Sequence, residues 1–277
     1  ENDDNVQSLL LADTPVIVIF GKSWDFHVTE IIRTSLEENL AMIRDTVAFF
    51  KARGKELVYD AEHFFDGYKN NPDYAVKSLQ AAAEGGADAL ILCDTNGGTF
   101  PSEVAKIVRT MVASFSVPIG IHAHNDCGMA VANSVMAVEN GARHVQGTYI
   151  GFGERCGNAN LSTIIANLGV KRGFECLPAD QYKNITRVAR HIAAISNVAL
   201  NERDPYVGNC AFAHKGGMHI DGVNKAAHSF EHINPDLVGG QRRFLMSEVS
   251  GRRMILEKIG EVDPSITKDD AVTDSII

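Results

Sequence analysis

The stretch from residue 117 to residue 126 reads Val-Pro-Ile-Gly-Ile-His-Ala-His-Asn-Asp, an apolar run that ends in polar residues. Its aliphatic first half predicts a buried strand over residues 117–122. Side chains two apart in a strand point to the same face, so we expect the imidazoles of His122 and His124 to project together. The stretch therefore predicts a strand with candidate site residues at its carboxyl end.

The same pattern recurs along the first half of the chain. Four further short aliphatic runs occupy residues 16–20, 57–59, 89–93 and 144–149. Segments with helical spacing lie between them; after the first run, apolar residues repeat at intervals of four and three at Leu36, Leu40, Ile43, Val47 and Phe50. A capping-box pattern at Thr34 and Glu37 predicts the start of this helix, and Asn71 with Pro72 predicts the start of the next. Strands that alternate with helices predict βαβ units, and hence an α/β fold with a parallel sheet.

Periodicity alone leaves two architectures open, a doubly wound open sheet and a (β/α)₈ TIM barrel. Polar residues follow all five runs, at residues 22–27, 60–62, 94–96, 122–126 and 151–158. A site built from the ends of many strands favours the barrel, because an open sheet concentrates its site at one switch point. We expect a partial barrel domain over residues 1–175 and a helical lid and linker subdomain over residues 176–277, with helices over residues 181–200 and 248–259.

Composition excludes several classes of protein. The 277 residues are 45% hydrophobic, and 35 acidic against 26 basic side chains give a net charge of -9, which argues against nucleic acid or an anionic membrane surface as partner. No apolar run approaches the roughly 20 residues of a membrane-spanning helix. The acidic start lacks the basic and apolar parts of a secretory signal. We therefore expect a cytoplasmic protein that acts on small molecules.

Two neighbouring histidines are the sharpest local signal. Neutral imidazoles at His122 and His124 would supply two adjacent ligands to a divalent ion. The alternative is a pair of unrelated, hydrogen-bonded histidines at a strand end. Residues 151–158, Gly-Phe-Gly-Glu-Arg-Cys-Gly-Asn, predict a tight loop that offers the amide oxygen of Asn158 to a ligand, or else a glycine-rich turn with an internal ion pair.

Three further residues have both a functional and an ordinary interpretation. Glu62 would orient a substrate or set the protonation of a histidine, or it is an exposed loop carboxylate. Thr95 would donate a hydrogen bond to a substrate carboxylate, unless Asp94 simply caps the turn. His219, which follows two glycines, would be an acid or base on a lid, or a solvated loop histidine.

Four motifs in this order make a resemblance specific. They are Cys-Asp-Thr-Asn-Gly-Gly at residues 93–98, His-Ala-His-Asn-Asp at 122–126, the glycine-rich loop at 151–158 and Ala-His-Lys-Gly-Gly-Met-His at 213–219. Together they resemble the metal-dependent acyl-CoA condensing enzymes, the family of 2-isopropylmalate, homocitrate and citramalate synthases. The resemblance covers nearly the whole chain and is strongest to the citramalate synthase type.

The resemblance implies a TIM barrel with a divalent metal, Mg²⁺, Mn²⁺ or Zn²⁺, held by His122 and His124 with Asn158 at or near the ion. It also implies that Thr95 contacts a 2-oxo acid and that His27 is a further histidine on the substrate side.

Glu62 and His219 resemble the pair involved in deprotonating the acetyl group of the co-substrate acetyl-CoA. In such enzymes the lid histidine can come from the neighbouring subunit, which implies a homodimer with exchanged lids.

The implied activity is condensation of acetyl-CoA with a 2-oxo acid, followed by thioester hydrolysis, in the biosynthesis of isoleucine or leucine. Pyruvate, giving citramalate, is the first choice, and 2-oxoisovalerate, giving 2-isopropylmalate, is the second. Two alternatives stay open: a metal-dependent lyase or aldolase that runs related chemistry in the direction of cleavage, and an inactive metal-binding fragment.

The sequence departs from the family pattern in three places. The Asp-x-x-Leu-Arg-Asp-Gly type motif of the first barrel strand does not occur here, so the resemblance implies that strands one to three are missing before Glu1. Phe230 stands where relatives usually carry a tyrosine eleven residues after the lid histidine. The regulatory domain of the family is also expected to be absent after Ile277.

Overall fold

The computed structural model describes residues 3–245, 255, 259–260, 262–263 and 265–266. By its internal contacts the chain divides into two compact units, Glu1–Ile164 and Ile165–Ile277, and each is described by itself.

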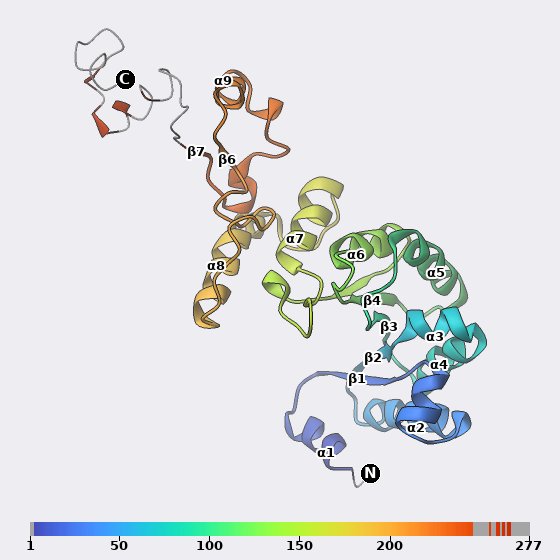
Figure 1. Ribbon diagram of the computed structural model, residues 1–277. Helices are drawn as coiled ribbons and strands as arrows, with labels where there is room; N and C mark the ends of the chain where they lie inside the picture. The colour runs from blue at the N-terminus through green and yellow to red at the C-terminus, as the bar shows by residue number, and fades with distance from the viewer. Residues whose placement is uncertain (1–2, 246–254, 256–258, 261, 264, 267–277) are drawn as a thin grey trace. The chain divides into compact units, whose positions relative to one another are not determined.

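The first unit is built on a parallel five-stranded sheet whose strand order follows the sequence. The strands are β1 (Val16–Lys22), β2 (Glu56–Glu62), β3 (Ala89–Asp94), β4 (Ile119–Ala123) and β5 (His144–Gln146). Helices connect them and lie on one face of the curved sheet (Figure 1). They are α2 (Leu36–Lys51), α3 (Phe64–Asn70), α4 (Pro72–Gly85), α5 (Pro101–Ser114) and α6 (Ala130–Glu139), with α1 (Asp4–Leu11) before the sheet. The predicted α/β fold with parallel strands is confirmed.

Local sequence explains where the connecting helices begin. Asn71 accepts a hydrogen bond from the backbone N–H of Tyr74 just before Pro72, as predicted for the start of α4. Helix α2 begins one residue later than a capping box at Thr34 would place it, because the Ser35 hydroxyl accepts from the backbone N–H of Glu38.

The core lies between these helices and the sheet. All six residues of β3 are buried, and α2 contributes Ile43, Val47 and Phe50, three of the five residues predicted for its apolar face. Among the described residues β1 pairs with β2 alone and leaves the side chains of Val18 and Phe20 exposed at 48% and 71%. Five strands form an open sheet rather than a closed barrel. Their assignment to barrel strands four to eight stays a prediction.

The second unit is mainly helical, as expected, and begins with the end of α7 (Leu161–Ile165) and the π-helix η3 (Ala166–Lys171). The helix expected over residues 181–200 is α8 (Ile185–Ile195), preceded by the short 3-10 helix η4 (Ala179–Asn184). Its other elements are α9 (Gly217–Lys225), the 3-10 helices η5 (Ala227–Ser229) and η6 (Pro235–Val238), and a parallel strand pair, β6 (Ala213–His214) with β7 (Arg243–Phe244).

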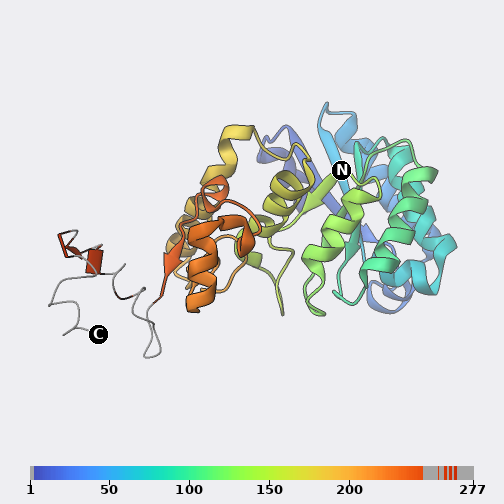
Figure 2. The same ribbon diagram turned by 90° about the horizontal axis from the view of Figure 1, so that it is seen from above.

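That strand pair was not expected from the sequence, because strands of two residues are too short to show an alternating hydrophobic pattern. The helix predicted over residues 248–259 lies almost wholly outside the described residues. Figure 2 gives a second view of the elements of both units. In the part of the chain that the structure describes, no helix is long and apolar enough to cross a membrane.

A buried ion cluster stabilises the second unit. Arg242 donates two hydrogen bonds of 2.6 Å to the carboxylate of Glu231, and His214 Nε2 lies 3.3 Å from the same group. Hydrogen bonds from Arg242, and then from His214, hold the pKa of Glu231 below its ordinary value although burial opposes this.

A carboxyl with a lowered folded pKa adds stability above its unfolded pKa, about 4.3, and loses it as the pH falls through the folded pKa. We expect Glu231→Gln to lower the free energy of unfolding at pH 7 by about 2 kcal/mol, with the deficit shrinking below about pH 4. Urea denaturation at both pH values measures this, with the exposed Glu175→Gln as control. An equal deficit at pH 7 and pH 3 would contradict the role given to the carboxylate charge.

Candidate active site

Strand register gathers five side chains in one row across the sheet. Lys22 pairs with Glu62 between β1 and β2, and His122 pairs with both Cys93 of β3 and Gln146 of β5. Ala61 is level with Leu92, which sets Glu62 level with Cys93. Alternating residues of parallel strands share a face, so these five side chains form one interior layer near the carboxyl ends of the strands.

His122 lies between two amide oxygens. Its Nδ1 is 2.7 Å from Gln146 Oε1, and its Nε2 is 2.9 Å from Asn158 Oδ1. The amide nitrogen of Asn158 donates to the carbonyl oxygen of Phe152, which turns the amide oxygen toward His122. A neutral imidazole carries a single N–H, so it can donate to only one of the two oxygens.

His124 lies beside His122, as the strand periodicity predicted. The two rings are stacked with centroids 5.3 Å apart, and His124 Nδ1 is buried with no hydrogen-bond partner among the described residues. Burial, and then the charges of His122 and Arg155, lower the pKa of His124, which favours the neutral form that binds metals. The glycine-rich loop folds back onto this strand through a bridge between His124 and Asn158. The structure thus brings the three predicted ligands together.

These donors fit a divalent ion. His122 Nε2 and Asn158 Oδ1 lie 2.9 Å apart, a separation that two ligands of one cation can have. Ligands about 2.1 Å from an ion and at right angles lie about 3 Å apart. The unpartnered Nδ1 of His124 offers a third donor. Imidazole nitrogen and amide oxygen together suit Mg²⁺, Mn²⁺ or Zn²⁺.

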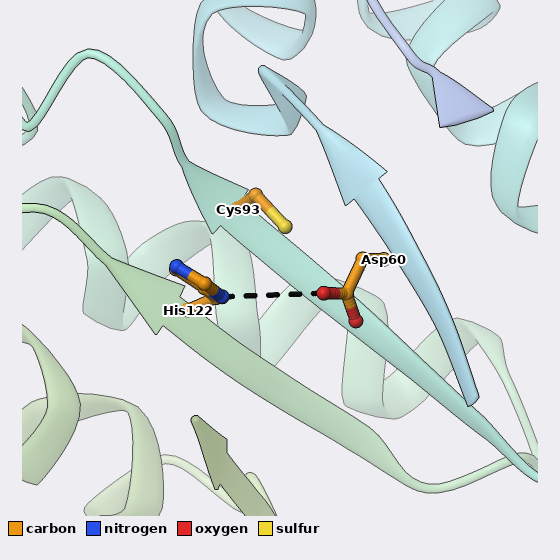
Figure 3. Close-up of side chains that lie close together, drawn as sticks. All are labelled: Asp60, Cys93 and His122. Atoms are coloured by element: carbon orange, nitrogen blue, oxygen red, sulfur yellow. Dashed lines mark ion pairs between the residues drawn. The ribbon is translucent and has the colours of Figure 1, made fainter. Parts of the chain in front are cut away.

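Two residues that were not predicted for the site also lie close to His122. Figure 3 shows the side chains of Asp60 and Cys93 pointing toward it from β2 and β3, all with ligand atoms within 4.8 Å of one another. Burial raises the pKa of Asp60 and raises that of the Cys93 thiol well above its ordinary value. The thiol donates to the carbonyl oxygen of Ile91 instead. Because a protonated thiol is a poor ligand, the donors on the other side of His122 fit an ion better.

An aromatic and charged cluster forms at the end of β1 and β2. The Glu62 carboxylate forms an ion pair with Lys22. The ring of His27 lies 4.1 Å from that of His63 and stacks on Trp24 at 5.3 Å. His27 Nδ1 is buried without a partner among the described residues, and burial followed by the charges of His63 and Lys22 lowers its pKa.

Thr95 joins this cluster through His63, a residue that the sequence analysis did not single out. The Thr95 hydroxyl oxygen accepts a 2.8 Å hydrogen bond from the backbone N–H of His63, which leaves its own proton for another acceptor. The backbone of His63 is left-handed, with φ at 57°. Few non-glycine residues adopt this conformation, and those that do are often found at functional sites. Its side chain is held by Asp66.

An arginine fastens the glycine-rich loop to its neighbours. Arg155 donates to both carboxylate oxygens of Asp126 at 2.8 and 2.9 Å and to the carbonyl oxygen of Thr95 at 2.7 Å. Arg155 also lies 3.8 Å from Glu154, the ion pair within the loop that the sequence suggested as an alternative. The loops after β3, β4 and β5 are therefore joined at the mouth of the sheet.

His219 belongs to the second unit. It lies in the first turn of α9 rather than on a loop, it is exposed, and its ring stacks on Phe230 with centroids 4.2 Å apart. The pairing of His219 with Glu62 stays a prediction, since the two residues lie in different units.

A parallel α/β sheet whose strand ends converge on imidazole and amide groups is typical of barrel-type α/β enzymes, which build their sites at the carboxyl ends of the strands. A family model described as HMGL-like matches residues 2–193, and the chain belongs to that family. A second model, described as homocitrate synthase post-HMGL domain-like, matches residues 206–276. Members of the HMGL-like family use a divalent metal and an acyl-CoA.

Several relatives with a named activity are similar to this chain in sequence. The chain is 52% identical over 267 residues to an (R)-citramalate synthase of Aquifex aeolicus, an alignment that covers 95% of this chain and 51% of the relative. It is 48% identical to the enzyme of that name from Geobacter sulfurreducens, with 100% and 52% covered. A probable 2-isopropylmalate synthase of Methanopyrus kandleri is 32% identical, with 96% and 52% covered. The chain thus spans about half the length of these relatives.

Solved structures support the fold. The HMG-CoA lyase of Bacillus subtilis superposes with a TM-score of 0.63 at 20% identity, over 73% of this chain and 70% of that one. The predicted barrel-type α/β fold is confirmed by this similarity and by the family match.

Proposed function

We propose that this chain carries the catalytic site of a citramalate synthase, which condenses acetyl-CoA with pyruvate and releases free CoA. One observation carries the choice of substrate. Five (R)-citramalate synthases are 45 to 52% identical to the chain, whereas the 2-isopropylmalate and homocitrate synthases found are 30 to 32% identical. The residue types at His122, His124 and Asn158 support the metal dependence of this reaction.

In this proposal the residues at the strand ends hold the 2-oxo acid. His122, His124 and Asn158 hold a divalent ion, which when bound draws electron density from the carbonyl group of the acid. Thr95 donates its free hydroxyl proton to the carboxylate of the acid. His27, with an unpartnered ring nitrogen, lies on the substrate side of the same mouth.

Glu62 and His219 together move the proton. Glu62 is held by Lys22 and sets the protonation of His219, which accepts a proton from the methyl group of acetyl-CoA. The enolate carbon then forms a bond to the carbonyl carbon of pyruvate, the C=O double bond opens onto its oxygen, and that oxygen takes up a proton to become the hydroxyl group of citramalate. Water cleaves the thioester bond and leaves the new carboxylate and the CoA thiol. Phe230 cannot pass a proton to or from His219, so its role beside that ring is to pack.

Free CoA measures the proposed activity directly. We expect the full-length protein, supplied with Mg²⁺ or Mn²⁺ and acetyl-CoA, to release CoA with pyruvate at a kcat/KM at least about tenfold above that with 2-oxoisovalerate. A thiol reagent follows the release, and mass spectrometry identifies citramalate.

Other outcomes of the same experiment separate the alternatives. No release with any 2-oxo acid would contradict the proposal. Cleavage of a 3-hydroxyacyl-CoA or a 4-hydroxy-2-oxo acid without condensation would indicate a lyase or aldolase. Metal binding without any turnover would indicate a binding protein.

Three finer proposals accompany this function. We propose a homodimer in which each His219 serves the partner's barrel, a cytoplasmic location, and a place in isoleucine rather than leucine biosynthesis. The named activity of the relatives supports the last of these. Mixing a His219→Ala chain with a Glu62→Gln chain tests the exchange, since one intact site forms per mixed dimer only if the histidine crosses over.

A further inference from the structure

Gln146 and Asp60 form a hydrogen-bonded chain that ends on His122. The amide nitrogen of Gln146 donates to Asp60 Oδ1 at 2.8 Å, and its amide oxygen lies 2.7 Å from His122 Nδ1. An ionised carboxylate can only accept hydrogen bonds. Asp60 therefore fixes which end of the Gln146 amide faces it, and the oxygen is left to face His122.

This orientation decides where His122 carries its proton. Both ring nitrogens face an amide oxygen, but the negative charge of Asp60 lies 3.9 Å from Nδ1 alone, so a neutral ring carries its proton on Nδ1 and keeps its lone pair on Nε2. The carbonyl oxygen of Phe152 fixes the amide of Asn158 in the same way, with the oxygen turned toward Nε2. Two amides, each oriented by a different acceptor, thus turn their oxygens to the two ring nitrogens of one imidazole.

The hydrogen-bonded residues Asp60, Gln146 and His122 all lie on strands of the sheet rather than on a mobile loop. Gln146 is level with His122 in the register of β5 with β4, and Asp60 reaches across from β2. The side chains of Asp60 and His122 are only 15% and 28% exposed, so water competes weakly for these bonds. Cys93 lies to one side of the two residues in Figure 3, and its thiol bonds to the carbonyl oxygen of Ile91 and takes no part.

We propose that Asp60 and Gln146 are positioning residues that hold His122 in its Nδ1-protonated tautomer, with Nε2 free to bind a divalent ion together with Asn158. The ion itself rests on the proposed function. A histidine ligand whose second nitrogen is held in this way is better oriented, and loss of the partner lowers metal affinity in other proteins about 10- to 100-fold.

Manganese binding to the full-length protein, measured by calorimetry, tests the proposal without any turnover. We expect Gln146→Leu to weaken Mn²⁺ binding about 10- to 100-fold. Asp60→Asn should weaken it less, because an asparagine amide can present either end to Gln146. The double variant Asp60→Asn with Gln146→Glu should recover most of the affinity, since the new amide donates to the new carboxylate and that carboxylate accepts from Nδ1–H.

The tautomer of His122 can also be measured directly in the absence of metal, which gives a second test that does not depend on metal affinity. In ¹⁵N-histidine spectra of the metal-free protein, we expect His122 to be protonated at Nδ1 in the wild type and in the double variant. Gln146→Leu should give a mixture of tautomers. Cys93→Ala is the matched control, and it should leave both the affinity and the tautomer unchanged.

Three results would overturn the proposal. They are an unchanged affinity and tautomer in Gln146→Leu, a loss in Cys93→Ala as large as in Gln146→Leu, and a wild type that binds no Mn²⁺. The second result would instead indicate an ion held by Asp60, Cys93 and His122. If the wild type binds Mn²⁺ and the variants behave as expected but no 2-oxo acid supports CoA release, the positioning role stands and the proposed function alone fails.

Discussion

Replacing His122 by alanine is expected to lower kcat/KM for CoA release about 10³-fold, a loss of about 4 kcal/mol of transition-state stabilisation. Gln146 and Asn158 both contact this imidazole, so its removal deletes a proposed metal ligand and also leaves both amide oxygens without their partner. His124→Ala should have a comparable effect, because its unpartnered Nδ1 is the third donor in the proposed site. Steady-state kinetics at saturating Mn²⁺ measures both losses.

Two comparisons show whether the loss is local. Thermal unfolding should place both variants close to the wild type, since these side chains lie at the mouth and not among the buried apolar residues. His191→Ala, an exposed histidine of α8, should keep full activity. If His122→Ala retains more than about a tenth of the wild-type kcat/KM at every Mn²⁺ concentration, the residue is not a metal ligand.

The fold could be predicted from sequence because its signals are local. Strand β3 is an uninterrupted apolar run up to its last residue, and Asn71 with Pro72 gives α4 its own start signal. The start of α2 was misplaced by one residue because Thr34 and Ser35 are both good capping residues, and only the structure decides between them. The β6–β7 pair joins residues about thirty positions apart, which no local pattern reveals.

The candidate site was predictable only where one strand or one loop carries it. His122 and His124 share a face because of strand periodicity alone, and Asn158 was found through the motif of its loop. Gln146 was missed because its place beside His122 depends on the register of β5 with β4. His63 was missed because nothing in its sequence signals a left-handed backbone, although it directly follows Glu62.

Replacing Glu62 by glutamine is expected to lower kcat about 10²- to 10⁴-fold, the range lost when a general acid–base group is removed. The substitution keeps an oxygen that can accept from Lys22, so the interior row across the sheet stays intact and Mn²⁺ affinity should not change. What it removes is the charge that sets the proton position in the proposed pair with His219. The rate at which deuterium from the solvent is incorporated into the methyl group of acetyl-CoA should decrease together with kcat.

Glu56→Gln is the matched control for this prediction, because Glu56 is an exposed carboxylate at the opposite end of the same strand and should tolerate the change. Comparing the kcat of Glu62→Gln with that of Glu56→Gln distinguishes the loss of a charge at the mouth of the sheet from the loss of any charge on β2. A Glu62→Gln enzyme whose kcat stays within about threefold of the wild type would place the proton transfer on other groups. His219 would then act without a carboxylate from β2, and the ion pair of Glu62 with Lys22 would serve the packing of the interior row.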